Sequence, residues 1–229
     1  FRQVWNYART NNLIIEESPT KKMKLPKVEN QRLRFLSHEE TERLLSELKN
    51  KSQQVHDMTL LSLHTGLRAG EIFSLTWGVI DFQNDSVLIR DSKGKTRHVF
   101  LTGATKEMFE NMRKGQAASE LVFKGSEGKQ IRKVSNTFER TVKELGFNNG
   151  VTDRRDKVTF HTCRHTFASW HVQNGTDLYT VKELLGHSTI QLTERYSHLR
   201  PEGLKKAAQI FDQKVIKNNI VSFEKAGNA

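Results

Sequence analysis

The segment 160–198 constrains the fold most strongly, because it has the pattern of several short helices separated by glycines. In its first part, apolar side chains recur at helical spacing, at Phe160, Cys163, Phe167 and Trp170. Such a stripe predicts a helix with one side in a hydrophobic core. His161, Arg164 and Ala168 fall on the adjacent face, about 100° around the helix. We therefore expect an imidazole and a guanidinium at the edge of the buried side.

Two glycines divide the rest of this segment. Asn174-Gly175 is expected to end the first helix, and Thr176 is expected to cap the second. Gly186 follows the last leucine of the second helix and should end it. His187 is therefore predicted to lie in a joint between helices, where helix geometry does not restrict the direction of its ring.

Two pairs of residues have the spacing of a capping box. Ser37 and Glu40 predict the start of a helix that continues for several turns. Ser188 and Gln191 predict the start of the last helix of the C-terminal segment, and Tyr196 lies near the end of that helix. Only one short helix is thus expected to separate Tyr196 from the joint that contains His187.

Arg68 lies in a second joint of this kind. A helix from about Val55 to Thr65 should end at Gly66, and Arg68 follows at once. An arginine between two packed helices is held stiffly, which suits a binding site. The structural alternative is that Arg68 caps the following helix or forms an ion pair with Glu71.

Residues 86–101 have the pattern of two β-strands joined by a hairpin. The tip, Ser92-Lys93-Gly94-Lys95, is rich in lysine, which by itself is typical of a solvated turn. A third strand is expected at 121–123, and apolar spacing over 131–145 predicts a long helix. The predicted fold class is α+β and mainly α-helical, with a small antiparallel β-sheet.

Charge and cysteine content narrow the class of protein. The 229 residues include 37 Lys and Arg against 26 Asp and Glu, a net charge of +11. This balance favours a polyanionic partner, above all nucleic acid, although solubility alone is an alternative. The single cysteine, Cys163, can form no internal disulfide, and no apolar run approaches the ~20 residues of a membrane helix. We therefore expect a cytoplasmic protein that makes no membrane contact.

Three blocks in this order resemble the signature of the tyrosine recombinases, the phage integrase family: HTGLRAGEIFSLTW, HTCRHTFAS and LLGHSTIQLTERYSHL. The resemblance implies a site-specific recombinase that integrates or excises a mobile element. It would cleave and rejoin double-stranded DNA through a covalent 3′-phosphotyrosine intermediate, with no metal and no nucleotide cofactor. The residues that the resemblance marks as catalytic are Arg68, Lys93, His161, Arg164, His187 and Tyr196.

The hairpin departs from the family pattern. The family has one more residue between its two basic positions, whereas here only Gly94 separates Lys93 from Lys95. Lys93 is the expected catalytic lysine, and Lys95 stays as the alternative. A lysine on a hairpin can reach the departing 5′ oxygen and give it a proton.

The chemistry explains why these residue types occur together. The tyrosine hydroxyl has an ordinary pKa of about 10, so attack on phosphorus needs a base and a cationic setting. His161 and the two arginines would supply them for Tyr196. Arg68 and Arg164 would each present two donors to the charge that gathers on the non-bridging oxygens, and His187 would hydrogen-bond one of these oxygens.

The resemblance also suggests how the chain is divided. Residues 1–17 would be the tail of a preceding core DNA-binding domain, and 18–34 a basic linker. Residues 35–211 would form the catalytic domain, and 212–229 a C-terminal tail that docks on a neighbouring protomer. Because Phe1 opens inside a predicted helix, we expect the chain to be part of a longer protein.

Partners and rival functions follow from the same residues. Strand exchange would need a homo-tetramer on two DNA sites, with accessory DNA-bending proteins as further candidates.

Type IB topoisomerases use related residues to relax supercoils, and a DNA-binding module without catalysis is another alternative. A zinc-dependent hydrolase could use His161, His165 and His187, but Thr162 stands where a zinc protease has its glutamate.

Overall fold

The computed structural model describes residues 1–23, 34–90 and 96–200. The chain separates into two compact units, Phe1–Gln31 and Arg32–Ala229. In the first unit, α1 covers Arg2–Thr10 and contains no buried residue. The finer division of the chain into tail, linker and catalytic domain stays a prediction. The hairpin tip with Lys93 and Lys95 and the tail 212–229 lie outside the described residues.

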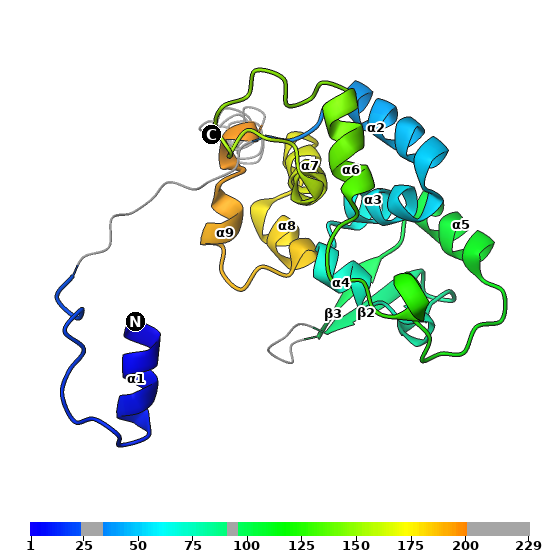
Figure 1. The fold of residues 1–229 in the computed structure, drawn as a ribbon. Coiled ribbons are helices and arrows are strands. Elements are labelled where there is room, and N and C mark those ends of the chain that lie inside the picture. The colour runs from blue at the N-terminus through cyan, green and yellow to red at the C-terminus, as the bar shows by residue number, and fades with distance from the viewer. Residues whose placement is uncertain (24–33, 91–95, 201–229) are drawn as a thin grey trace, which may run out of the picture. The chain divides into compact units, whose positions relative to one another are not determined.

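The second unit carries the remaining elements (Figure 1). Its helices are α2 His38–Lys51, α3 Gln53–Thr65, α4 Ala69–Phe73, α5 Gly103–Met112, α6 Asn136–Glu144, α7 Phe160–Gln173, α8 Leu178–Leu185 and α9 Gln191–Glu194. Its strands are β1 Ile80–Asp81, β2 Ser86–Arg90 and β3 Thr96–Phe100. Short 3-10 turns include Trp77–Val79 and Ser197–Leu199. This arrangement confirms the predicted class, mainly α-helical with a small antiparallel sheet.

The helix ends agree with the sequence pattern in the first half of the unit. The Ser37 side chain accepts from the backbone of Glu40, and the Glu40 carboxylate accepts from the backbone of Ser37, so the capping box at the start of α2 is confirmed. Gly66 ends α3 in the left-handed conformation, with φ of 68°. Arg68 then forms the N-cap of α4, which is the position that the structural alternative gives it.

The sheet has the order β1-β2-β3, but its third strand is not the predicted one. β1 pairs with β2 through Ile80 and Asp81, whereas Leu121 forms only an isolated bridge with Thr76. The reason is local: the Asp81 carboxylate accepts hydrogen bonds from the Asn84 backbone and side chain and closes a tight turn into β2. Strands adjacent in the sequence are therefore neighbours in the sheet.

Helix starts in the second half differ from prediction in three places. The helix expected over 131–145 begins only at Asn136, because Ser135 caps it. Asp177 rather than Thr176 caps α8, and its carboxylate accepts from two backbone N–H groups. The predicted capping box of Ser188 and Gln191 does not form, and α9 is a single turn without a side-chain cap.

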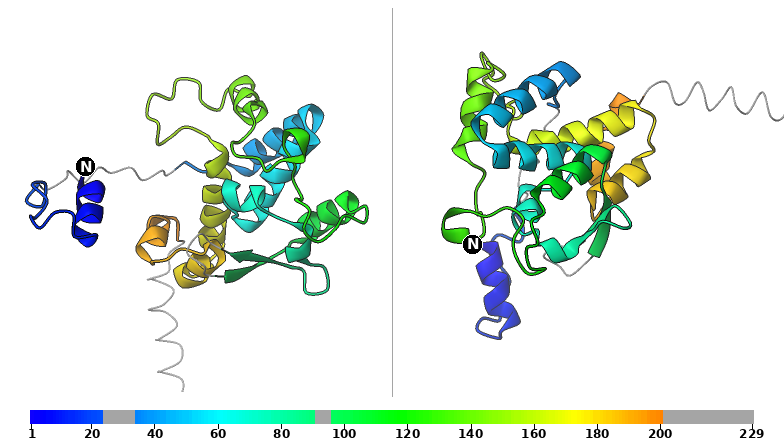
Figure 2. Two further views of the ribbon diagram at one scale, coloured as in Figure 1. Left: turned by 60° about the horizontal axis from the view of Figure 1, so that its bottom comes forward. Right: turned by 90° about the vertical axis from the view of Figure 1, so that its right-hand side faces the viewer.

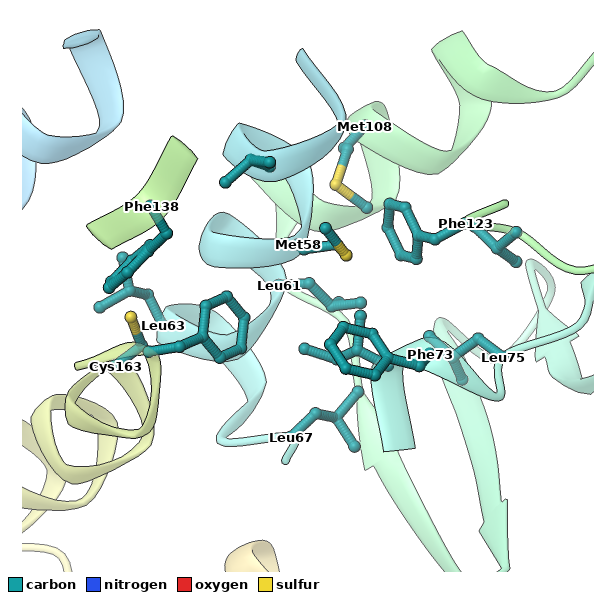
Figure 3. Close-up of a cluster of buried hydrophobic side chains, with 14 of the residues drawn as sticks. Met58, Leu61, Leu63, Leu67, Phe73, Leu75, Met108, Phe123, Phe138 and Cys163 are labelled. Carbon is teal, nitrogen blue, oxygen red and sulfur yellow. The ribbon is translucent and has the colours of Figure 1, made fainter. Parts of the chain in front are cut away.

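The main core surrounds α3. Buried side chains of α3, α5 and α7 point toward one another and toward the aromatic rings of Phe73, Phe123 and Phe138 (Figure 3). Cys163 lies at the α7 edge of this core and is buried. Burial raises the pKa of its thiol to about 12, so the thiol stays protonated and acts as a small apolar side chain.

A second, smaller core lies on the other side of α7. It consists of Phe167, Ala168, Val172, Val181, Leu185 and Tyr196. Helix α7 therefore contacts α3 on one side and α8 with the turn Ser197–Leu199 on the other, and the left view of Figure 2 shows these segments around it. The residues of this helix that face neither core are the ones available to a functional site.

Gly66 offers a test of this packing. A Cβ added there would lie 2.7 Å from the Phe167 ring and 2.9 Å from a Leu185 methyl group, at a positive φ. Gly66→Ala is therefore expected to lower the free energy of unfolding by about 2–4 kcal/mol in urea denaturation. Gly103→Ala is the control, because its added methyl group would meet nothing within 4 Å. Equal losses in the two variants would contradict this account of the joint.

Candidate active site

Arg164 is a buried charge that connects three helices. Its residue is only 2% exposed, on the second turn of α7. Its two terminal nitrogens donate hydrogen bonds of 2.6 Å each, one to the Gly66 carbonyl and one to the Leu185 carbonyl. These carbonyls lie at the C-terminal ends of α3 and α8, which carry partial negative charge. Burial lowers the Arg164 pKa to about 9, so the guanidinium stays charged at neutral pH.

The Glu71 carboxylate holds two further arginines. Arg97 donates to both of its oxygens at 2.9 Å, and Arg68 donates to one of them at 3.0 Å. Burial acts to raise the Glu71 pKa, but the bonds from Arg97 and Arg68 outweigh it and lower the pKa. The ion pair that the sequence offered as an alternative for Arg68 thus exists. It leaves the Arg68 side chain 40% exposed, so the pair orients the guanidinium without burying it.

A cleft of about 310 Å³ opens between β3 and the C-terminal end of α8. It is lined by Thr96, Arg97, Lys182, Glu183, Gly186, His187 and Ser188. A Cβ at Gly186 would lie 2.7 Å from Arg97, so only glycine lets this arginine approach the backbone here. The wall carries the cationic Arg97 and Lys182 and the His187 imidazole, together with one carboxylate, Glu183, which pairs with Lys182. The excess of cationic groups favours an anionic group such as a backbone phosphate.

His187 is held in one orientation by Thr193. Its Nδ1 lies 2.8 Å from the hydroxyl oxygen of Thr193, which is fully buried. When that hydroxyl donates to Nδ1, the ring proton resides on Nε2, the nitrogen that can then serve as donor. Burial, followed by the charges of Arg164 and Arg68, lowers the His187 pKa to about 3. His187 is therefore a neutral hydrogen-bond donor at physiological pH.

Tyr196 lies in the interior, at the start of the turn Ser197–Leu199. It is 5% exposed, and its hydroxyl oxygen is 2.6 Å from Nδ1 of His165, itself 4% exposed. Burial raises the Tyr196 pKa to about 12, although the charges of Arg195 and Arg164 act in the opposite direction. The tyrosine is thus within electrostatic reach of Arg164, while its hydroxyl is directed at a histidine.

His161 lies one helical turn before His165 on α7. It is exposed, and its ring meets the His165 ring edge to face with centroids 4.7 Å apart. The sequence assigns the tyrosine's proton to His161, but in this conformation His165 is the histidine in contact with the phenol. The two imidazoles form a column that leads from the surface to Tyr196.

The predicted residues differ in how far the structure brings them together. Arg164 and Arg68 both lower the pKa of His187, and Arg164 also acts on the pKa of Tyr196, so Arg164 is the residue that the surroundings of His187 and Tyr196 share. Their assignment as catalytic stays a prediction. Lys93, like its alternative Lys95, lies outside the described residues.

Three residues of the site are not among those predicted as catalytic: Glu71, Arg97 and His165. The sequence predicts Glu71, three positions after Arg68, only as an ion-pair partner in the structural alternative for Arg68. His165 was considered only as a zinc ligand, although its spacing from His161 places both on one helix face. For Arg97 the sequence holds no such signal, because only the fold brings β3 against the end of α8.

No group of three His, Cys, Asp or Glu residues in residues 1–23, 34–90 and 96–200 is arranged to hold a metal ion. His165 contacts Tyr196 and Nδ1 of His187 contacts Thr193, so the zinc set considered from the sequence is not assembled. No helix in the described part of the chain has the length and apolar character needed to cross a bilayer.

Comparison with known proteins shows which family has a sequence of this kind. The model of the phage integrase family matches residues 34–202. The tyrosine recombinase XerA of Saccharolobus solfataricus is 31% identical over 182 residues, 79% of this chain and 57% of that protein. The chain therefore spans little more than half the length of this relative.

Solved structures give a similar result. The catalytic domain of bacteriophage HP1 integrase matches with a TM-score of 0.59 and 28% identity, over 77% of this chain and 94% of that domain. The Tn1549 transposon integrase, solved in complex with a circular intermediate DNA, matches with a TM-score of 0.61 over 93% of this chain and 76% of that chain. At 20% identity, the second comparison is evidence of a shared fold.

The electrostatics of His187 can be tested by NMR titration. Because burial and nearby arginines lower its pKa to about 3, its ring protons should not shift between about pH 8 and pH 5, a range in which an ordinary histidine titrates near 6.5. The His187→Gln variant identifies the resonance by its loss. A midpoint near the ordinary value would show that His187 is not enclosed by cations as described.

Proposed function

Since this chain belongs to the phage integrase family, we propose that it breaks and rejoins double-stranded DNA as a site-specific tyrosine recombinase. The observation that carries the proposal is the pair of hydrogen bonds from Arg164 to the Gly66 and Leu185 carbonyls, beside the two joints that carry Arg68 and His187. The charge of Arg164 also acts on the pKa of Tyr196. The donors to a phosphate and a phenol that can attack it thus belong to one site. The cleft beside His187 provides space for the DNA backbone.

In the proposed reaction, the Tyr196 hydroxyl oxygen attacks the phosphorus atom and the bond from phosphorus to the 5′ oxygen breaks. A 3′-phosphotyrosine bond forms, and the 5′ oxygen leaves as a hydroxyl once it receives a proton. The phenol's own proton passes to a base, for which His161 is the exposed imidazole on α7. A 5′ hydroxyl from another strand reverses these steps and rejoins the DNA, so the chemistry needs no external energy source.

Charge stabilisation would come from the two arginines. Arg68 has a partly exposed side chain that Glu71 orients, and Arg164 has N–H donors beyond the two that bind carbonyls. Both can donate to the non-bridging oxygens, where negative charge accumulates in the transition state. His187 adds a neutral N–H donor, because its Nδ1 is occupied by Thr193.

We assign the leaving-group proton to Lys93, with Lys95 as the alternative. The strands β2 and β3 pair in register from Ser86 with Phe100 to Arg90 with Thr96, so both lysines belong to the loop that joins paired strands. Arg97, two residues beyond Lys95, lines the cleft. Thr96 and Arg97, the first described residues after Lys95, thus line the cleft, which supports a catalytic lysine in this loop.

The proposed partners follow from charge and from the fold. The net charge of +11 favours a DNA partner, and the Tn1549 integrase with the same fold was solved in complex with DNA. Exchange of strands between two sites requires four tyrosines, hence a homo-tetramer on two DNA sites, with accessory DNA-bending proteins as possible additions. The DNA substrate and the single buried thiol are consistent with action in the cytoplasm.

The nucleophile can be tested with a nicked duplex that traps the covalent intermediate. Tyr196→Phe should abolish the protein–DNA adduct and change duplex affinity by less than about twofold, because phosphate binding depends on lysines and arginines. Tyr179→Phe is the matched control, since Tyr179 is 70% exposed and should give the adduct at the normal rate. An adduct that persists in Tyr196→Phe would disprove the assignment.

The lysine assignment requires a comparison of two variants. Lys93→Ala should slow cleavage by roughly 10²–10⁴-fold, the usual effect of losing a general acid, whereas Lys95→Ala should slow it by less than about tenfold. Sulfur in place of the 5′ bridging oxygen leaves without a proton, so it should restore the rate of Lys93→Ala. If sulfur instead restores Lys95→Ala, the roles of the two lysines are exchanged.

A further inference from the structure

His165 is the only side chain for which the structure shows a hydrogen bond to the Tyr196 hydroxyl within the described residues, at 2.6 Å between Nδ1 and the hydroxyl oxygen. Both residues are at least nine-tenths buried, and their ring centroids are 5.9 Å apart. A buried hydroxyl without a partner is costly, so this bond determines where the phenol can rest. The mechanism above gives His165 no task.

The location of this bond does not suit attack on DNA. A phosphate in a duplex reaches the protein surface, whereas Tyr196 is 5% exposed and belongs to the buried cluster that includes Phe167 and Leu185. His161, by contrast, is exposed and lies four residues before His165 on α7. Helix geometry separates equivalent positions one turn apart by about 5.4 Å along the axis. The same helix face thus offers an inner and an outer imidazole.

The backbone around Tyr196 permits a shift between these two positions. Helix α9 is only four residues long and has no side-chain cap, and the turn Ser197–Leu199 that follows Tyr196 is also short. So short an element is held by packing rather than by its own hydrogen bonds. Moving the tyrosine outward therefore requires no long helix to unfold.

We propose that His165 is a positioning residue that holds the Tyr196 phenol in a buried resting position, one helical turn inward from His161, until DNA binding draws it to the site. The phenol O–H donates to Nδ1 of His165 in the resting position. On DNA the phenol leaves His165, and its proton becomes accessible to His161. This inference rests on the proposed function, because it takes Tyr196 as the nucleophile.

The experiment observes Tyr196 alone. The chain has three tyrosines, and Tyr7 and Tyr179 are each 70% exposed. Replacing these two by phenylalanine and labelling with 3-fluorotyrosine gives one ¹⁹F resonance, that of Tyr196. A soluble gadolinium chelate then reports how close the ring lies to solvent. In the protein without DNA, the resonance should be protected from the chelate, and a nicked duplex should shift it.

Two His165 variants of nearly equal shape isolate the hydrogen bond. His165→Leu removes the acceptor, so the Tyr196 resonance should lose its protection and shift toward its position in the urea-unfolded protein. His165→Asn keeps a polar atom near the position of Nδ1, so most of the protection should remain. His171→Leu on the same helix is the control, since His171 bonds to Thr176 and should leave Tyr196 protected.

The same variants should differ in reaction rate. If leaving His165 costs one net hydrogen bond, His165→Leu should form the adduct on a nicked duplex roughly fivefold faster than the parent protein, and His165→Asn at nearly the parent rate. An unchanged ¹⁹F signal in His165→Leu, or slower adduct formation, would overturn the resting role. If the parent protein forms no adduct at all, the proposed function fails instead, whatever the ¹⁹F result.

Loss of structure in His165→Leu is detected through Cys163. This thiol is buried on the same helix, so it should stay unreactive to a thiol reagent if the variant is folded. If it reacts, ¹⁵N-histidine NMR on the parent protein decides the matter. The Nδ1 resonance of His165, identified by its loss in His165→Asn, should shift in Tyr196→Phe. An unchanged Nδ1 resonance would show that the hydrogen bond is absent and overturn the proposal.

Discussion

The site depends on one buried guanidinium. Arg164 belongs to α7 and donates to the carbonyls at the ends of α3 and α8, so its guanidinium connects three helices. A charge so deeply buried is tolerated only when it is well paired. The negative ends of two helix dipoles and two short hydrogen bonds supply that pairing. Without Arg164, two buried carbonyls would lose their donor, which is more costly than the loss of a surface ion pair.

The same interaction explains why the other site residues lie where they do. Gly66 and Gly186 end α3 and α8 in the left-handed conformation, and each is followed within two residues by a predicted site residue, Arg68 or His187. Arg164 fixes the carbonyl of Gly66 itself and that of the residue before Gly186. Both joints are therefore held against α7, and Arg68 and His187 extend from fixed backbone rather than from long loops.

Sequence reasoning succeeded where the information is local. Apolar spacing predicted that Phe160, Cys163 and Phe167 of α7 are buried, and the glycines predicted the helix ends. The predicted single stripe is divided, however, because Phe160 and Cys163 belong to the main core and Phe167 to the second. The prediction was wrong where two neighbouring residues can both cap a helix. Asp177 caps α8 in place of Thr176, because its carboxylate accepts hydrogen bonds from two backbone N–H groups. Sequence reasoning could not find Arg97 in the cleft, since that placement depends on β3 meeting α8. The phenol's contact with His165 instead of His161 also depends on packing, because both histidines lie on one helix face.

A guanidinium can fill a structural and a chemical role at once, because its donors are arranged in a plane. Arg164 uses two of its five N–H groups on the helix carbonyls, and in the proposed reaction the others would serve the phosphate. A lysine has its three donors on one atom and could not hold two carbonyls and orient toward a third group in the same way. The charge that would stabilise the transition state is therefore in place only when α3, α7 and α8 are packed. Assembly of the site and closure of this part of the fold are consequently the same event.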